Sequence, residues 1–205
     1  MNRFSGHDLT CIRGERTVFQ GLGFALSSGD ALVLTGANGS GKSSLLRLMA
    51  GLLRPAAGAV RWDDGDAFAD PDAHHARLHY LGHLDAVKPV LTAAENVSFW
   101  AAMRGGGKVD GALAAFGIRH LMDVPGRFLS AGQKRRVALA RVLAAPAPLW
   151  LLDEPATALD KAATGLLRDA IARHRADGGM VVVSTHADLG LDGASGLDLG
   201  QGSGP

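Results

Sequence analysis

The chain has 205 residues, of which 47% are hydrophobic and 20% charged, values typical of a globular protein that buries one core. Twenty-one basic against twenty acidic residues give a formal net charge of +1, which excludes a strong overall field for nucleic acid or an anionic membrane surface. Cys11 is the single cysteine, which excludes an internal disulfide and a cysteine-based zinc site. We expect one domain over residues 1–205, in a reducing compartment.

We identify neither a secretory signal nor a membrane-spanning segment in the sequence. The N-terminus has no apolar stretch followed by a small-residue cleavage site, so we expect the protein to stay in the cytoplasm. The most apolar stretch, Val142 to Leu152, is shorter than a membrane span and contains Pro146 and Pro148. If the protein serves a membrane process, another chain must cross the bilayer.

The first thirty residues carry short apolar pieces, Thr17–Phe19 and Phe24–Leu26, interrupted by Gly21, Gly23 and Gly29. Short apolar pieces separated by glycines are typical of strands joined by turns. We predict an antiparallel β edge here.

Later segments alternate between short apolar runs and longer stretches of helical character. We predict buried parallel strands at Ala31–Thr35, Leu78–Leu81, Leu149–Asp153 and Met180–Ser184, and helices at Lys42–Ala50, Ala93–Met103, Gln133–Leu143 and Ala162–Arg175. This alternation indicates an α/β sheet with helices packed on it.

Two segments differ from this alternation. Residues 89–124 are helical in pattern with a break at Gly105–Gly107, which predicts a helical insertion, and the helical subdomain is placed at about 89–148. The tail, residues 190–205, is rich in Gly, Asp and Ser and is predicted to be loose.

A phosphate-binding loop lies between the first predicted parallel strand and its helix. Glycines let the backbone fold around an anion and point its N–H groups inward, at the positive end of the following helix. Lys42 is expected to reach the β- and γ-phosphates, and Ser43 to hold Mg²⁺. We therefore predict ATP and Mg²⁺ as ligands, with nucleotide binding by Gly36, Ala37, Asn38, Gly39, Ser40, Gly41, Lys42, Ser43 and Ser44.

Two adjacent carboxylates, Asp153 and Glu154, end the strand Leu149–Asp153. Alternate side chains of a strand point in opposite directions, so the two can divide their roles. Asp153 is predicted to bind Mg²⁺ and Glu154 to act as the general base on an attacking water. By itself, this pattern fits polar capping of a buried strand equally well.

The segment Leu129–Gln133 precedes the helix that leads into that strand. Ser130 and Gln133 fit a helix-capping box, and a serine hydroxyl with free N–H groups at a helix start also forms an anion-binding surface. The cations that follow, Lys134–Arg136, lack interleaved aromatic residues, so a solvated or ligand-facing helix start is favoured over nucleic-acid binding.

Together these motifs resemble those of the ABC ATPases. The segment Leu129–Gln133 is similar to the family signature Leu-Ser-Gly-Gly-Gln, with Ala131 in place of one glycine, and two further family elements follow in order at Ala158–Asp160 and His186. The resemblance implies a P-loop NTPase sheet of ABC ATPase type, with an N-terminal antiparallel β edge and a helical insertion.

The resemblance also implies a homodimer. Ser130, Gly132 and Gln133 are expected to face the γ-phosphate held by the partner subunit's Lys42, so that two ATP molecules join two subunits. His186 is expected to contact the same phosphate, as a second catalytic residue.

Two positions depart from the family pattern. Many ABC ATPases stack adenine on an aromatic residue of the N-terminal β region, where Arg13 stands here; a guanidinium can also stack. The glutamine that usually follows the strand after the phosphate loop is replaced by His83 or, one residue later, by Leu84.

A narrower resemblance rests on Gly82-His83, Lys88, Leu91–Ala93, Glu95–Val97 and Ser130–Arg141. These segments look like the haem-exporter ATP-binding subunits of cytochrome c maturation. The resemblance implies integral membrane partner subunits, met through the insertion after Pro89, and a place on the cytoplasmic face of the inner membrane. An ABC exporter subunit for another small substrate, a soluble ABC ATPase acting on DNA or ribosomes, and a nucleotide kinase are the alternatives.

Overall fold

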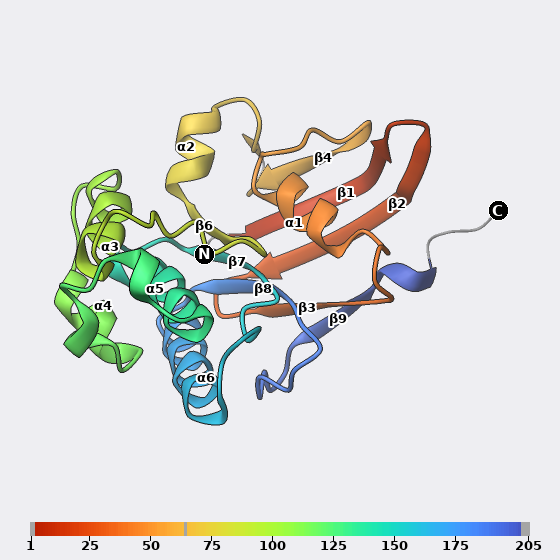
Figure 1. Cartoon of the computed structure of the whole chain (residues 1–205). Coiled ribbons are helices and arrows are strands. Elements are labelled where there is room, and N and C mark those ends of the chain that lie inside the picture. The colour runs from red at the N-terminus through yellow and green to blue at the C-terminus, as the bar shows by residue number, and fades with distance from the viewer. Residues whose placement is uncertain (1–2, 64, 202–205) are drawn as a thin grey trace.

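The computed structural model describes residues 3–63 and 65–201, and Figure 1 shows their arrangement. The strands are β1 (Arg3–Arg13), β2 (Arg16–Ser27), β3 (Ala31–Thr35), β4 (Ala57–Trp62), β5 (Gly65–Asp66), β6 (Leu78–Leu81), β7 (Leu149–Asp153), β8 (Met180–Ser184) and β9 (Ser195–Asp198). The α-helices are α1 (Lys42–Met49), α2 (Pro71–Ala76), α3 (Ala93–Ala102), α4 (Val109–Ala115), α5 (Ala131–Ala144) and α6 (Lys161–Ala176). Three single 3₁₀ turns are Arg119–Leu121, Gly126–Phe128 and Leu199–Gln201.

Two sheets form the frame of the molecule. The N-terminal sheet is antiparallel, in the order β2-β1-β4-β5, and the second sheet has the order β6-β7-β8-β3-β9 with every pairing parallel. Helix α1 lies between them, and α3 to α6 lie on the opposite side of the parallel sheet (Figure 1). The predicted P-loop sheet, β edge and helical insertion are therefore present.

The parallel sheet is covered on both faces, and successive side chains of its inner strand β7 pack alternately on one face and the other. Leu149 and Leu151 of β7 pack in the cluster with α1 and the antiparallel sheet, whereas Trp150 and Leu152 pack in the cluster with α3 to α6. Strands buried on both faces read as continuous apolar runs. This explains why β7 and β8 begin and end where the sequence predicts.

The helical segment packs as part of the same core. Helices α3, α4 and α5 contact one another, and their buried residues share one hydrophobic cluster with the parallel sheet. Gly105 and Gly106, between α3 and α4, have φ of 84° and 100°, a conformation that favours glycine. The boundaries 89–148 for a helical subdomain stay an interpretation.

The prediction of a loose tail is wrong for part of residues 190–205. Strand β9 pairs in parallel with β3, from Leu32↔Ser195 to Thr35↔Asp198, and Leu199 is buried. The backbone hydrogen bonds of the sheet edge order this segment, although its side chains are mostly exposed and carry no strand pattern. Residues 202–205 of the predicted tail lie outside the described residues.

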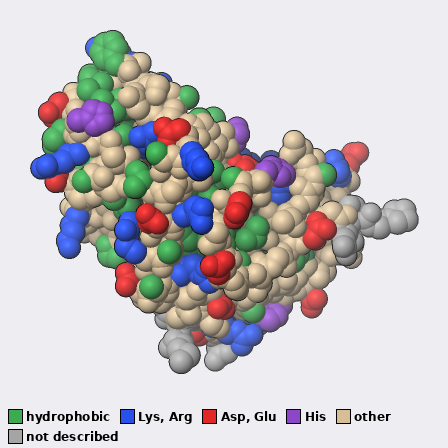
Figure 2. All heavy atoms as spheres, turned by 90° about the horizontal axis from the view of Figure 1, so that it is seen from below, with side chains coloured by type: hydrophobic (Ala, Val, Ile, Leu, Met, Phe, Trp, Pro, Cys, Tyr) green, Lys and Arg blue, Asp and Glu red, His purple; other side chains and the backbone are tan. Residues whose placement is uncertain are grey.

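Two surface properties bear on partners. Among the described residues, no helix combines the length and apolar character needed to span a bilayer. On the face drawn in Figure 2, Lys and Arg side chains are interspersed with Asp and Glu, in keeping with the nearly balanced charge of the sequence.

Candidate functional site: a nucleotide cleft, a signature cleft and a groove

The phosphate loop joins β3 to α1. Gly41 starts the helix at φ 108° and makes no side-chain cap, so the first N–H groups of α1 are left for an external anion. The ammonium of Lys42 donates to the carbonyl oxygens of Gly36 at 2.7 Å and Ala37 at 3.0 Å, which holds it inside the loop. A valine at position 18 packs within 2.6 Å of where a Cβ on Gly41 would lie, so glycine is required there.

The loop fits a phosphate chain by a second observation. Within the described part of the chain, the buried hydroxyl oxygen of Ser40 has no hydrogen-bond partner. An unpaired buried hydroxyl is costly, and a phosphate oxygen would satisfy it. Ser43 is exposed beside the loop, and its hydroxyl and the Asp153 carboxylate are oxygen groups of the kind that Mg²⁺ prefers, so Mg²⁺ binding by these two residues stays a prediction.

The two carboxylates at the end of β7 have different surroundings. Asp153 is 2% exposed and accepts a hydrogen bond of 3.1 Å from the hydroxyl of Ser184 on β8. Glu154 is half-buried, with φ 47°, a left-handed conformation that is rare for residues other than glycine. Its Oε1 lies 3.7 Å from Nε2 of His186, whose side chain is 65% exposed. Asp153 is therefore held in place, whereas Glu154 is more exposed and His186 lies next to it, open to solvent.

Residues of the phosphate loop, Asp153 and Glu154 meet in one cleft of about 420 Å³, which His186 does not line. Its lining combines the phosphate loop, the end of β7 and the antiparallel sheet: Arg13, Arg16, Val18, Asn38, Gly39, Gly41, Lys42, Ser43, Ser44, His83, Asp153, Glu154 and Ser184. Arg13 therefore lies on the wall of this cleft, and its contact with adenine stays a prediction. Of the two candidates for the missing glutamine, His83 lines this cleft and Leu84 does not.

The signature residues line a separate cleft of about 360 Å³ that shares no residue with the first. Ser130, Gly132, Gln133, Arg136 and Asp160 contribute to it. The capping box is present as well: the N–H of Ser130 donates to Oε1 of Gln133 at 2.8 Å, and the N–H of Gln133 donates to Oγ of Ser130 at 3.3 Å. The predicted residues therefore lie around two separate clefts, and Gly36, Ala37, Ser40 and His186 line neither of them.

The structure corrects part of the interpretation of the cations that follow the signature. Asp160 caps α6, accepting from the N–H of Ala163 at 2.7 Å, and pairs with Arg136 at 2.7 Å. Arg135, in contrast, is only 2% exposed, so the prediction of a solvated or ligand-facing cation is wrong at this position. Its contacts are long-range, with residues up to 53 positions away, and no local pattern encodes them.

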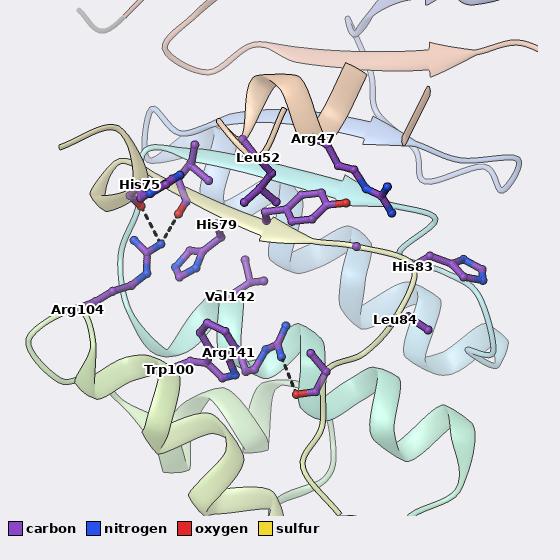
Figure 3. A pocket seen from close by; sticks show the side chains of 15 residues that line it. Arg47, Leu52, His75, His79, His83, Leu84, Trp100, Arg104, Arg141 and Val142 are labelled. Carbon is purple, nitrogen blue, oxygen red and sulfur yellow. Dashed lines mark hydrogen bonds between the residues drawn. The ribbon is translucent and has the colours of Figure 1, made fainter. Parts of the chain in front are cut away.

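A groove of about 440 Å³ lies beside the nucleotide cleft (Figure 3). Its walls are the ends of α1 and α2, strand β6 with the loop 82–86 that follows it, and the helices α3 and α5. Its apolar lining includes Leu52, Leu84 and Trp100, which are 61%, 81% and 39% exposed. Arg141 projects into it, with its guanidinium carbon 5.0 Å from the centre of the Trp100 ring. Burial lowers the pKa of Arg141 to about 10, so it stays charged at neutral pH.

Arg104, on the other wall, anchors the segment before β6. It donates to the carbonyl oxygens of Ala76 at 3.1 Å, His75 at 3.0 Å and Leu78. His83 lines both this groove and the nucleotide cleft. The groove and the ATP site therefore share one wall.

Sequence reasoning missed several residues of this region. Arg16 and Val18 of β2 line the nucleotide cleft, and Ser184 orients Asp153. Only Ser184 has a sequence signal, as the last residue of a strand predicted to be buried in the same sheet. The positions of Arg16 and Val18 depend on how the two sheets pack, which no local pattern specifies.

Comparison with known proteins identifies relatives along nearly the whole chain. A family model described as "ABC transporter" matches residues 19–157. A protein of Rhodospirillum rubrum named "Cytochrome c biogenesis ATP-binding export protein CcmA" is 64% identical over 198 residues, covering 96% of this chain and 85% of the relative. A protein of the same name from Paramagnetospirillum magneticum is 62% identical over 205 residues, covering 97% and 94%.

Solved structures share the fold. An ABC transporter ATP-binding protein from Pyrococcus furiosus superposes with a TM-score of 0.84 at 21% identity, covering 98% of this chain and all of that one. A structure titled as the ATP-binding subunit of an ABC transporter gives 0.86 at 22% identity, covering 96% and 86%. At these identities the likeness concerns the fold alone.

Proposed function

The chain belongs to the ABC transporter ATP-binding proteins, among those of cytochrome c biogenesis, and from this membership we propose that its ATPase activity drives a haem-handling membrane complex that makes c-type cytochromes. It is an ATPase and the ATP-binding subunit of an export system, working with membrane partner subunits. The further steps, haem as the cargo and the cytoplasmic face of the inner membrane as the location, are part of the proposal.

The observation that carries the catalytic part is the placement of Glu154 and Lys42 in one cleft. The N–H groups of the loop and the Lys42 ammonium bind the phosphates of ATP. Glu154, at the mouth of the cleft, accepts the proton of the attacking water, and His186 orients the γ-phosphate. Mg²⁺, when bound by Ser43 and Asp153, would neutralise charge that develops on the phosphates.

We propose a homodimer, which the separation of the two clefts supports. Helix α5 presents Ser130 and Gly132 on a cleft that shares no residue with the cleft of the phosphate loop, so this surface lies apart from the ATP bound in the same chain. We propose that this surface covers the ATP of the partner subunit. ATP then stabilises the closed dimer, and hydrolysis opens it.

The groove in Figure 3 is the proposed contact with the membrane subunits. Exposed apolar side chains, with Arg141 and Arg104 on the walls, suit a short amphipathic segment that carries an acidic residue. Because the groove shares His83 with the nucleotide cleft, a movement there reaches the ATP site directly.

The test is a haem stain for c-type cytochromes in cells that lack this protein, complemented with the native chain, Lys42→Ala or Glu154→Gln at matched expression. The expected result is loss of the stained bands and restoration by the native chain only. Normal bands in cells without the protein would contradict the role of haem while leaving the ATPase in place.

A further inference from the structure

One buried arginine joins the turn of the catalytic carboxylate to the signature helix. Arg135 lies in the first turns of α5 and is 2% exposed. Its Nη2 donates to the carbonyl oxygens of Asp153 at 2.9 Å and Glu154 at 2.6 Å, and its Nε donates to that of Pro155 at 3.1 Å. Three successive carbonyl groups thus converge on one guanidinium.

This convergence bears on the conformation of Glu154. A residue other than glycine keeps a left-handed backbone only where its surroundings hold it. Around Glu154, the N–H donates to the carbonyl oxygen of Ser184 at 2.9 Å, and the carbonyl oxygen accepts from Arg135. Hydrogen bonds from a charged donor are stronger than neutral ones. The backbone conformation of Glu154, and with it the orientation of its side chain, is therefore supported by Arg135.

The same guanidinium holds the loop that separates the nucleotide cleft from the groove. Nη1 of Arg135 donates to the carbonyl oxygen of Gly82 at 3.2 Å and pairs with Oδ1 of Asp85 at 2.9 Å. Six residues further along α5, Arg141 donates to the carbonyl oxygens of Asp85 at 2.9 Å and Ala86 at 3.3 Å. Figure 3 shows Arg141 and His83 around this loop.

We propose that Arg135 is a positioning residue for ATP hydrolysis, which keeps the Glu154 side chain in the orientation that activates the water. Because Arg135 also binds the loop 82–86, this orientation depends on that loop and so on the segment bound in the groove. The geometry requires an arginine, because a planar fork with five N–H donors reaches carbonyl groups on both sides, and an ammonium does not. The inference rests on the proposed function, in which Glu154 activates the water.

The first experiment measures ATP hydrolysis by the assembled complex with its membrane subunits, for the native chain and for Arg135→Gln. We expect kcat to fall about 100-fold because Glu154 is misplaced. The KM for ATP and the binding of a non-hydrolysable ATP analogue should stay within about twofold, because the hydrogen bonds of Arg135 go to residues 82–85 and 153–155 and not to the phosphate loop. Native kcat in this variant would overturn the proposal, and so would a loss of analogue binding as large as the loss of kcat.

Arg135→Lys separates geometry from charge. It keeps the positive charge and loses the fork, so kcat should remain at least about tenfold below native. Full activity in Arg135→Lys would show that charge alone matters and would refute the positioning role. Arg119→Gln is the matched control, because Arg119 is exposed and, among the described residues, its one ion pair is with the exposed Asp110. The kcat of this variant should equal the native value.

Asp85→Asn tests the link to the groove and stays informative if Arg135→Gln fails to fold. The Asp85 side chain is 26% exposed, and the change removes the ion pair while leaving the carbonyl bonds of Arg135. We expect the ratio of ATPase activity in the complex to that of the isolated subunit to fall several-fold toward one. An unchanged ratio would refute the link. Failure of Glu154→Gln to lower native activity would instead refute the proposed catalytic role itself.

Discussion

Stability at mildly acidic pH is expected to depend on His79, a buried residue of β6 that lines the groove. It is 8% exposed, and its Nε2 lies 2.8 Å from the carbonyl oxygen of Ala145, so the neutral ring donates from Nε2. Burial, followed by the charges of Arg104, Arg141 and His174, lowers the pKa of His79 from 6.5 to about 4, although the hydrogen bond to Ala145 raises it in part.

The sign follows from proton binding. Between pH 6.5 and pH 4 the unfolded chain takes up a proton at this position and the folded chain does not. The free energy of unfolding therefore has its full value above pH 6.5 and falls as the pH falls. From pH 7 to pH 5, His79 alone accounts for a loss of about 2 kcal/mol. Burial also lowers the pKa values of His74 and His174, which adds to the loss in the native protein.

The assay is urea unfolding of the native protein and His79→Gln at pH 7 and pH 5. Glutamine keeps a donor for the Ala145 carbonyl and removes the titrating ring. The stability lost between the two pH values should be about 2 kcal/mol smaller in the variant. Equal losses in the two proteins would refute the reasoning, because the remaining histidines are common to both.

Two further predictions concern the nucleotide. Glu154→Gln should lower kcat by at least about 100-fold and leave an ATP-bound dimer that size-exclusion chromatography detects. The double variant with Ser130→Ala should be monomeric under the same conditions, and a dimer that persisted would contradict the assignment of the signature cleft. Arg13→Ala should raise the KM for ATP roughly two- to fivefold with unchanged kcat, as expected for an exposed cation stacked on adenine, and an unchanged KM would show that Arg13 makes no such contact.

The elements that could be predicted from sequence are those whose side chains carry the information. Strands β7 and β8 are apolar throughout because both faces are buried, and α1 and α5 follow the glycines or the capping pair that start them. Strand β9, in contrast, has mostly exposed side chains and exists because β3 offers free backbone groups at the sheet edge. Backbone pairing of this kind leaves no trace in hydrophobicity.

The site divides in the same way. The phosphate loop is one continuous segment whose function depends on local backbone shape, so its residues can be recognised without a structure. Arg135 acts through contacts with two segments, residues 82–85 and 153–155, which only folding brings next to α5. In the sequence it is one of three neighbouring cations, and nothing distinguishes it from Arg136, which pairs at the surface with Asp160.

Helix α5 connects the three functional regions of the molecule. Its 14 residues span about 21 Å, and its N-terminus carries Ser130 at the signature cleft. Within it, Arg135 holds the turn of Glu154, and Arg141 holds the loop at the groove. Because a helix moves as a rigid body over this length, a displacement imposed at either the proposed dimer contact or the groove would reach Glu154 through Arg135. Hydrolysis can in this way respond to both partners through one element.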